Sequence, residues 1–231
     1  MLSKIKDPEK LKEQCNKHVE KGLASNPTVK FLMERLVSMG CIPPKDFIRC
    51  KECTKEAGGG FGVVEETVIV EDEESKKRAS LQQCERSLQD LRNQIRAEKD
   101  GKSKLTLKPE IYLCQQHIQS EDHAHTSMVH ELIHAVDMCR TKMDPLNNCI
   151  HMACTEIRAQ NLSGECAPWK EFIGGQIKSF PNHGKTCVKR RALLSVKENP
   201  NCRDRANDYV EAAFERCYKD TFPFDRHPSV R

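Results

Sequence analysis

The sequence predicts an α+β domain that is rich in cysteine and held together by disulfide bonds. Segments with strand character come early in the chain and helical patterns dominate its later part, which is typical of the α+β class. Thirteen cysteines are scattered through 231 residues, of which 31% are charged and 5% aromatic. A chain of this length can enclose one sizeable core, so we expect a single domain over residues 1–231.

The N-terminal part predicts two helices, a loop and a strand. Residues 4–24 are compatible with a charged helix, and Asn26, followed by proline, begins a second helix that ends at Gly40. Residues 41–62 have the prolines and glycines of a loop. Their glycine run lacks the lysine and the serine or threonine of a phosphate-binding loop and predicts a turn into a strand. The β-branched residues 67–70 predict that strand.

The composition changes between residues 71 and 104, which we expect to form a charged helical insertion on the surface of the domain. The apolar residues of this segment are spaced three and four apart, as in a short heptad seam. They are Leu81, Cys84, Leu88, Leu91 and Ile95. A further strand is predicted at residues 110–114, and helices are predicted at 125–141, 150–161 and 205–219.

Composition and charge exclude several classes of function. The formal net charge is only +4, and the short basic run at 189–191 has no interleaved aromatic residues, so we expect no nucleic-acid binding. The longest apolar stretches fall far short of the ~20 residues of a membrane-spanning helix. The N-terminus lacks the apolar core of a secretory signal, and its early acidic residues are atypical of a mitochondrial transit peptide.

The cysteines favour disulfide bonds over a zinc ribbon. A ribbon needs two paired clusters, whereas only Cys50 and Cys53 have CxxC spacing and the other sulfurs occur singly. Disulfide bonds persist in oxidising compartments, so we expect such a compartment, entered without a signal peptide. Because the number of cysteines is odd, at least one thiol stays free or pairs with another molecule.

The stretch Val-His-Glu-Leu-Ile-His at residues 129–134 predicts a zinc site of the metallopeptidase type. On a helix, His130 and His134 lie one turn apart on the same face, where two imidazoles can bind one Zn2+ ion. Glu131 lies about 100° around the helix and can act as the catalytic base toward a water molecule at the metal. The alternative is an amphipathic helix with two incidental histidines. The flanking apolar residues and the preceding strand disfavour it.

A catalytic zinc ion needs a third protein ligand, and Glu156 is the preferred candidate because it lies early on the next predicted helix. Asp137 lies about 10 Å beyond His130 along the helix axis, so we expect it to support the site from outside or to form a surface pair. The other candidates are Glu165, His151, His183 and Asp137 itself. Arg158 either stabilises developing charge or pairs with an acid.

The zinc motif belongs to a set of stretches that together suggest one family. They are His-Glu-Leu-Ile-His-Ala-Val-Asp-Met-Cys-Arg at 130–140, Ala-Cys-Thr-Glu-Ile-Arg-Ala-Gln-Asn-Leu-Ser-Gly-Glu-Cys at 153–166, Lys-Thr-Cys-Val-Lys-Arg-Arg at 185–191, Asn-Pro-Thr-Val-Lys-Phe-Leu at 26–32, the CxxC at 50–53, Gly-Gly-Phe at 59–61 and Phe-Glu-Arg-Cys at 214–217. Together these stretches span nearly the whole chain outside 71–104. They resemble the mitochondrial inner membrane metalloproteases that assist assembly of ATP synthase.

This resemblance implies a zincin-like zinc metalloendopeptidase with one Zn2+ ion per chain, His130 and His134 as metal ligands and Glu131 as the catalytic residue. It implies a peripheral position on the inner membrane, on its intermembrane-space side, and entry through the disulfide relay. The implied substrates are the precursor of ATP synthase subunit a and other proteins of the intermembrane space. The implied partners are the Fo subunits, whose assembly the family assists independently of proteolysis.

The resemblance also divides the cysteines into two groups. Ten fall at family-like positions, enough for five bridges: Cys15, Cys41, Cys50, Cys53, Cys114, Cys139, Cys154, Cys166, Cys187 and Cys217. Cys84, Cys149 and Cys202 depart from the family pattern. The insertion at 71–104 is a further departure, and it separates two strands that are expected to lie close together.

Zincin architecture suggests how a substrate binds. The strand at 110–114 is expected to border the cleft, and a substrate segment to add to it as a further β-strand. The alternative function is a protease-independent assembly chaperone or adaptor with a vestigial or structural zinc site, which the heptad-bearing insertion supports. A third alternative, a nuclear partner in DNA repair, has only the modest positive charge in its favour.

Overall fold

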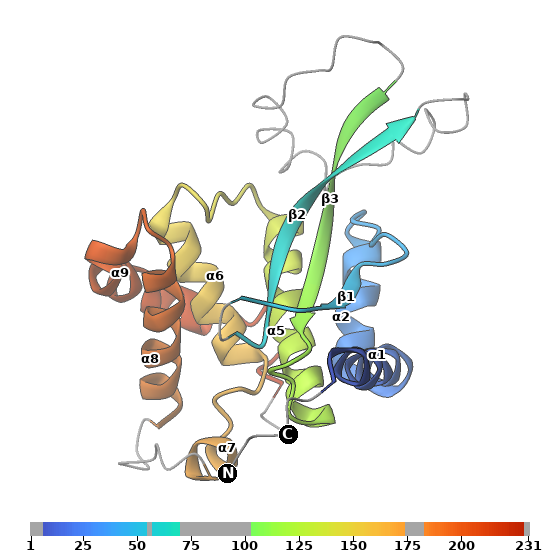
Figure 1. Cartoon of the computed structure of the whole chain (residues 1–231). Helices are drawn as coiled ribbons and strands as arrows, with labels where there is room; N and C mark the ends of the chain where they lie inside the picture. The colour runs from blue at the N-terminus through green and yellow to red at the C-terminus, as the bar shows by residue number, and fades with distance from the viewer. Residues whose placement is uncertain (1–6, 55–56, 70–102, 174–182, 229–231) are drawn as a thin grey trace. The chain divides into compact units, whose positions relative to one another are not determined.

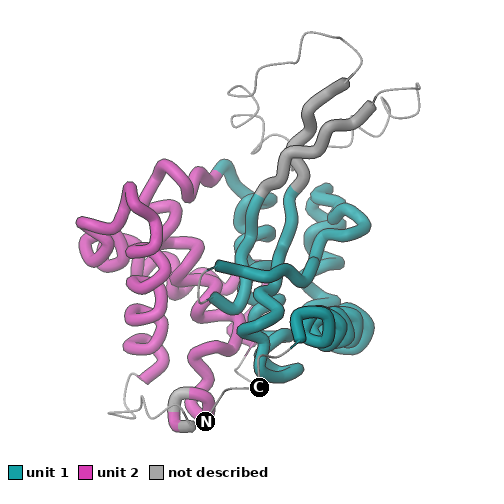
Figure 2. The backbone as a smooth tube through the Cα atoms, in the orientation of Figure 1, with its two compact units in different colours: residues 1–142 teal, residues 143–231 magenta. Residues whose placement is uncertain are grey.

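The structure, a computed structural model, describes residues 7–54, 57–69, 103–173 and 183–228. Most of its elements are helices, and the remaining strands form one small mixed sheet (Figure 1). This composition confirms the predicted α+β class. The chain divides into two units, residues 1–142 and 143–231, shown in two colours in Figure 2. One domain over the whole chain stays a prediction. The predicted helical insertion lies outside the described residues, except that its last two residues belong to a strand.

The first unit contains a three-stranded sheet with the order β1-β3-β2. Strand β3 (Ser103–Cys114) runs parallel to β1 (Ile48–Lys51) and antiparallel to β2 (Gly59–Ile69). Residue Ile69 at the end of β2 is paired with Ser103 at the start of β3. The two strands that flank the predicted insertion in sequence are therefore neighbours in the sheet, as expected.

Strand β3 is the central strand, so the predicted addition of a substrate strand to residues 110–114 is wrong. Ile111 is paired with Ile48 on one side and with Phe61 on the other. A strand whose two edges are both hydrogen-bonded has no free backbone groups for a further strand. Among the described strands, the outer edges of β1 and β2 remain for such pairing, together with the part of β3 before Ile111, which only β2 borders.

Two expectations for residues 41–62 are also wrong. Strand β1 lies within the predicted loop, and the glycine run forms the start of β2 rather than a turn. Glycine is depleted in strands, which is why the pattern favoured a turn. At Gly59 the reason for glycine is a close backbone approach, because a Cβ atom there would lie 2.6 Å from the carbonyl oxygen of Tyr112 on β3.

Helix α5 (Glu121–Arg140) is the element around which the first unit packs. It contacts α1 (Pro8–Ser25), α2 (Pro27–Ser38) and the strands β2 and β3 (Figure 1). Ser120 caps its first turn, where the Ser120 hydroxyl accepts a hydrogen bond from the backbone N–H of His123. The helix is buried along most of its length. Its apolar side chains therefore pack on more than one face, and its polar side chains are buried among them.

The second unit is helical and is built around α6 (Cys149–Leu162). This helix packs against α8 (His183–Glu198) and α9 (Ala206–Lys219), and the short helices α7 (Pro168–Ile173) and η1 (Arg203–Arg205) complete the unit. The core between them is apolar and includes Ala153, Ile157, Val188, Ala192, Val196, Val210 and Phe214. Helix α8 was not predicted from the sequence. Among the helices described in either unit, none is long and apolar enough to cross a bilayer.

Twelve of the thirteen cysteines form six disulfide bonds, which confirms the predicted disulfide framework. The first unit contains Cys15–Cys50, Cys41–Cys139 and Cys53–Cys114, and the second contains Cys149–Cys202, Cys154–Cys217 and Cys166–Cys187. The ten family-like cysteines make five of these bonds. Two of the three departures, Cys149 and Cys202, pair with each other. The third, Cys84, lies outside the described residues.

Replacing Gly59 by alanine is expected to lower the free energy of unfolding by about 1–3 kcal/mol. The Tyr112 carbonyl that the new Cβ would meet is part of the paired strand and cannot move without disturbing the pairing. Gly62 is the matched control on the same strand, because a Cβ there meets nothing within 4 Å and alanine is expected to be neutral or slightly stabilising. Denaturant unfolding followed by circular dichroism compares the two, and equal stabilities would contradict the close approach at Gly59.

Removing the Cys149–Cys202 bond by paired serine substitutions is expected to lower the free energy of unfolding by about 2–4 kcal/mol, since a bridge over 53 residues restricts the unfolded chain. The five remaining bonds should keep the variant folded. Thermal unfolding without reductant measures the loss. Thiol titration of the denatured, unreduced natural chain should find one free thiol, and three would show that this bond does not form.

Candidate metal centre

His130 and His134 lie one turn apart on α5, as the sequence predicts. Their ring centroids are 4.9 Å apart with an angle of 73° between the planes, so the imidazoles meet edge to face. Both side chains are only 8% exposed. Two adjacent imidazoles in a sheltered position are a typical donor pair for Zn2+ and other transition metals.

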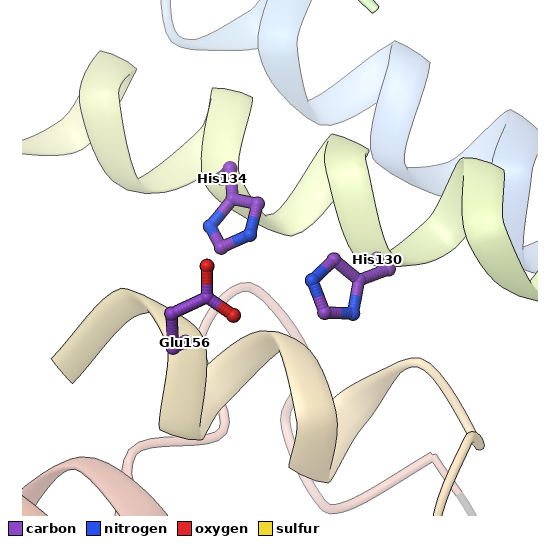
Figure 3. Close-up of side chains that lie close together, drawn as sticks. All are labelled: His130, His134 and Glu156. Carbon is purple, nitrogen blue, oxygen red and sulfur yellow. The ribbon is translucent and has the colours of Figure 1, made fainter. Parts of the chain in front are cut away.

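Glu156 joins the two histidines. It lies on α6, and one carboxylate oxygen of Glu156 and one ring nitrogen of each histidine all lie within 4.8 Å of one another. Figure 3 shows the carboxylate directed toward the two rings. Zinc ligand atoms lie about 2.0–2.2 Å from the ion, so the donors of one ion are at most about 4.4 Å apart, and the three atoms here need only a small approach to hold a single metal ion. Two imidazoles and one carboxylate are also the donor set of zinc peptidases that keep a coordination position open for catalysis.

Glu131 follows His130 in sequence and is 7% exposed, which makes it as sheltered as the histidines. The phenol of Tyr112 interacts electrostatically with the Glu131 carboxylate. Burial raises the pKa of Tyr112 above its usual value, and the negative charges of Glu131 and Glu110 raise that pKa further. Tyr112 therefore stays protonated near neutral pH, where its phenol is a hydrogen-bond donor. No local pattern in the sequence points to this tyrosine, because its relation to Glu131 depends on how β3 packs against α5.

Asp137 does not belong to the group of ligand atoms found among the described residues. Its side chain is completely buried, and its Oδ1 atom lies 3.2 Å from Nε of Arg140 in an ion pair. The expectation of an ion pair is confirmed, but the pair is not on the surface. The Asp137 carbonyl also accepts hydrogen bonds from the backbone N–H and the hydroxyl of Thr141, at the point where the helix ends.

The other candidates for the third ligand do not belong to the group of ligand atoms found among the described residues. Glu165 forms an ion pair with Arg191 of α8 at 2.8 Å. The Nδ1 atom of His151 accepts a hydrogen bond from the backbone N–H of Asp144. His183 is the first residue of α8, and it is likewise not part of the ligand group found among the described residues.

Arg158 has a structural role. Its side chain is completely buried on α6 and pairs with the Asp220 carboxylate at 2.7 Å. It also donates hydrogen bonds to the backbone carbonyls of Asp220 and Phe222. Of the two roles that the sequence left open for this arginine, the structure shows pairing with an acid. The guanidinium ties the C-terminal turn to α6.

The HExxH helix, with its two sheltered histidines and a carboxylate within reach of both, defines a metallopeptidase of the zincin-like type. The sequence pattern of the Peptidase M76 family matches residues 13–86 and 75–225. The chain therefore belongs to this family, and the enzyme class predicted from its motifs is confirmed.

Curated relatives cover most of the chain. A mitochondrial inner membrane protease atp23 of Aspergillus clavatus is 30% identical over 217 residues, which are 92% of this chain and 72% of that protein. The mitochondrial inner membrane protease ATP23 homolog of Homo sapiens is 31% identical over 218 residues, 94% of this chain and 71% of its own length. The atp23 protease of Schizosaccharomyces pombe is 43% identical over 118 residues, 50% of this chain and 63% of its own. No solved structure matches the chain.

Proposed function

We propose that the chain is a zinc metalloendopeptidase whose metal is held by His130, His134 and Glu156. The observation that supports this proposal most strongly is the convergence of one potential ligand atom from each residue within 4.8 Å. Two imidazoles favour Zn2+ over Mg2+ or Ca2+, which prefer oxygen ligands. One bound Zn2+ ion would supply a Lewis acid for the carbonyl of the scissile peptide.

In this proposal Glu131 is the general base. Its carboxylate accepts a proton from the attacking water and passes it to the departing amine, which leaves the residue unchanged after each turnover. Its place beside His130 on one rigid helix fixes the distance between the base and the metal ligands. The low exposure of Glu131 limits competition from bulk water for the proton.

We propose that the chain acts where its relatives are named, at the mitochondrial inner membrane, attached peripherally on the intermembrane-space side. Six disulfide bonds support an oxidising compartment. The proposed substrates are the precursor of ATP synthase subunit a and other intermembrane-space proteins. Assistance to Fo assembly is the proposed second role, which the family resemblance implies.

Replacing Glu156 by glutamine is expected to weaken zinc binding by at least about tenfold, because the amide keeps the shape of the carboxylate but removes its charge. Glu165→Gln is the matched control, since it makes the same chemical change at a carboxylate that binds Arg191 instead. His134→Ala should remove the zinc. The measurement is zinc per chain in oxidised protein after dialysis against chelators of graded strength. If Glu156→Gln and Glu165→Gln hold zinc equally well, the third ligand is another residue.

Replacing Glu131 by glutamine is expected to lower the rate of peptide cleavage by about 10²–10⁴-fold while zinc binding persists, because the base is lost and the ligands are not. A peptide that spans the presequence junction of subunit a is a suitable substrate. Cleavage at the natural rate would remove Glu131 as the base. Full rescue of ATP synthase assembly by this inactive variant would favour the protease-independent chaperone as the main role.

A further inference from the structure

Helix α7 exposes two aromatic side chains. Trp169 is 54% exposed and Phe172 is 70% exposed, and their spacing of three residues puts both on one face of the helix. Trp169 is the only tryptophan of the chain. Large aromatic side chains are mostly buried in folded proteins, so two adjacent exposed ones mark a surface that contacts something other than water.

A covalent bond fixes this aromatic pair to the second unit. Cys166, two residues before α7, is bonded to Cys187 of α8, and α7 also contacts α8 directly. At the start of α7 the backbone N–H of Lys170 donates a 3.0 Å hydrogen bond to the carbonyl of Ala167. The aromatic face is therefore displayed on an anchored helix, and the described residues of the second unit leave it exposed.

We propose that Trp169 and Phe172 form a lipid-binding site that inserts into the headgroup region of a phospholipid bilayer. This proposal rests on the proposed inner-membrane location, but it is independent of the metal centre. The attachment proposed above is peripheral and so uses a surface of the protein; no described helix can cross a bilayer. The aromatic face of α7 is the surface whose chemistry suits that task.

The composition of the face favours lipid over a protein partner. Tryptophan prefers the membrane interface, where its ring lies among the acyl chains and its N–H reaches the headgroups. The Nζ atom of Lys170 lies 5.2 Å from the centroid of the Trp169 ring, which places a cation beside the inserting side chain. An ammonium group there can pair with a lipid phosphate while the lysine stem stays in the apolar layer.

The helix to which α7 is bonded adds positive charge. Helix α8 carries five basic residues, Lys185, Lys189, Arg190, Arg191 and Lys197, and its one acidic residue is Glu198. Three of the five form ion pairs with neighbouring carboxylates. The basic side chains of this helix outnumber its acidic ones, which suits an anionic membrane surface.

The single tryptophan allows a direct test with the full-length, oxidised chain. Vesicles of phosphatidylcholine with a minor fraction of phosphatidylglycerol are titrated into the protein while Trp169 fluorescence is recorded. We expect the emission to shift to shorter wavelength and to be quenched by phosphatidylcholine with brominated acyl chains. Phe172→Ser keeps the reporter, and it should weaken vesicle partitioning by about tenfold or more because half of the inserting surface is lost.

Ile42→Ser is the control, because Ile42 is 65% exposed in the first unit and its replacement removes a similar amount of exposed apolar surface. This variant should partition like the natural chain. Both variants should cleave a soluble peptide at the natural rate, so a failure of this proposal is distinguishable from a failure of the metal centre. Sedimentation with vesicles without a change in Trp169 emission would assign lipid binding to another surface. A lack of vesicle binding would also overturn the proposal. So would a shift in Trp169 emission that appears when a partner protein is added and not when lipid vesicles are added.

Discussion

The burial of ionisable side chains on one helix is the constraint on which the first unit depends. Helix α5 holds His130, Glu131, His134 and Asp137 at low exposure. An isolated charge in such a place costs several kcal/mol, which a chain retains only if partners or ligands compensate for it. Asp137 has Arg140 as its compensating cation. The histidines and Glu156 have the geometry of a site in which a divalent cation would supply the compensation.

A helix with so many polar buried positions contributes less apolar surface than its length suggests, and the whole chain is only 37% hydrophobic. Disulfide bonds offset this shortage by restricting the unfolded chain. The Cys41–Cys139 bond shows the principle most clearly. It ties the last turn of α5 to Cys41, three residues beyond the end of α2, so the helix carrying the histidines is fixed close to its packing partner by a covalent bond as well as by contacts.

The elements that the sequence predicted are those with a strong local pattern. The periodicity of α5, α6 and α9 was sufficient, and so was the composition of residues 110–114 at the end of β3. Glu156, expected from its place on the helix after the HExxH motif, lies with the two histidines, and its role as a metal ligand stays a prediction. What failed depended on distant contacts. The internal position of β3, the extended glycines of β2 and the environment of Tyr112 are decided by strands and helices far away in sequence. The pairing of twelve cysteines is likewise a tertiary property, which no spacing encodes.

The six described disulfide bonds respect the boundary between the two units, since each joins two residues on the same side of residues 142–143. The order of cysteines along the chain thus separates oxidative folding into two smaller problems. A chain that is oxidised from its N-terminus can complete one set of bonds before the other set is present, and each set has far fewer wrong partners than twelve thiols mixed together. The same partition leaves the backbone as the covalent connection between the halves in the described chain, so one cut near residue 142 would leave two separately cross-linked pieces with no described covalent bond between them.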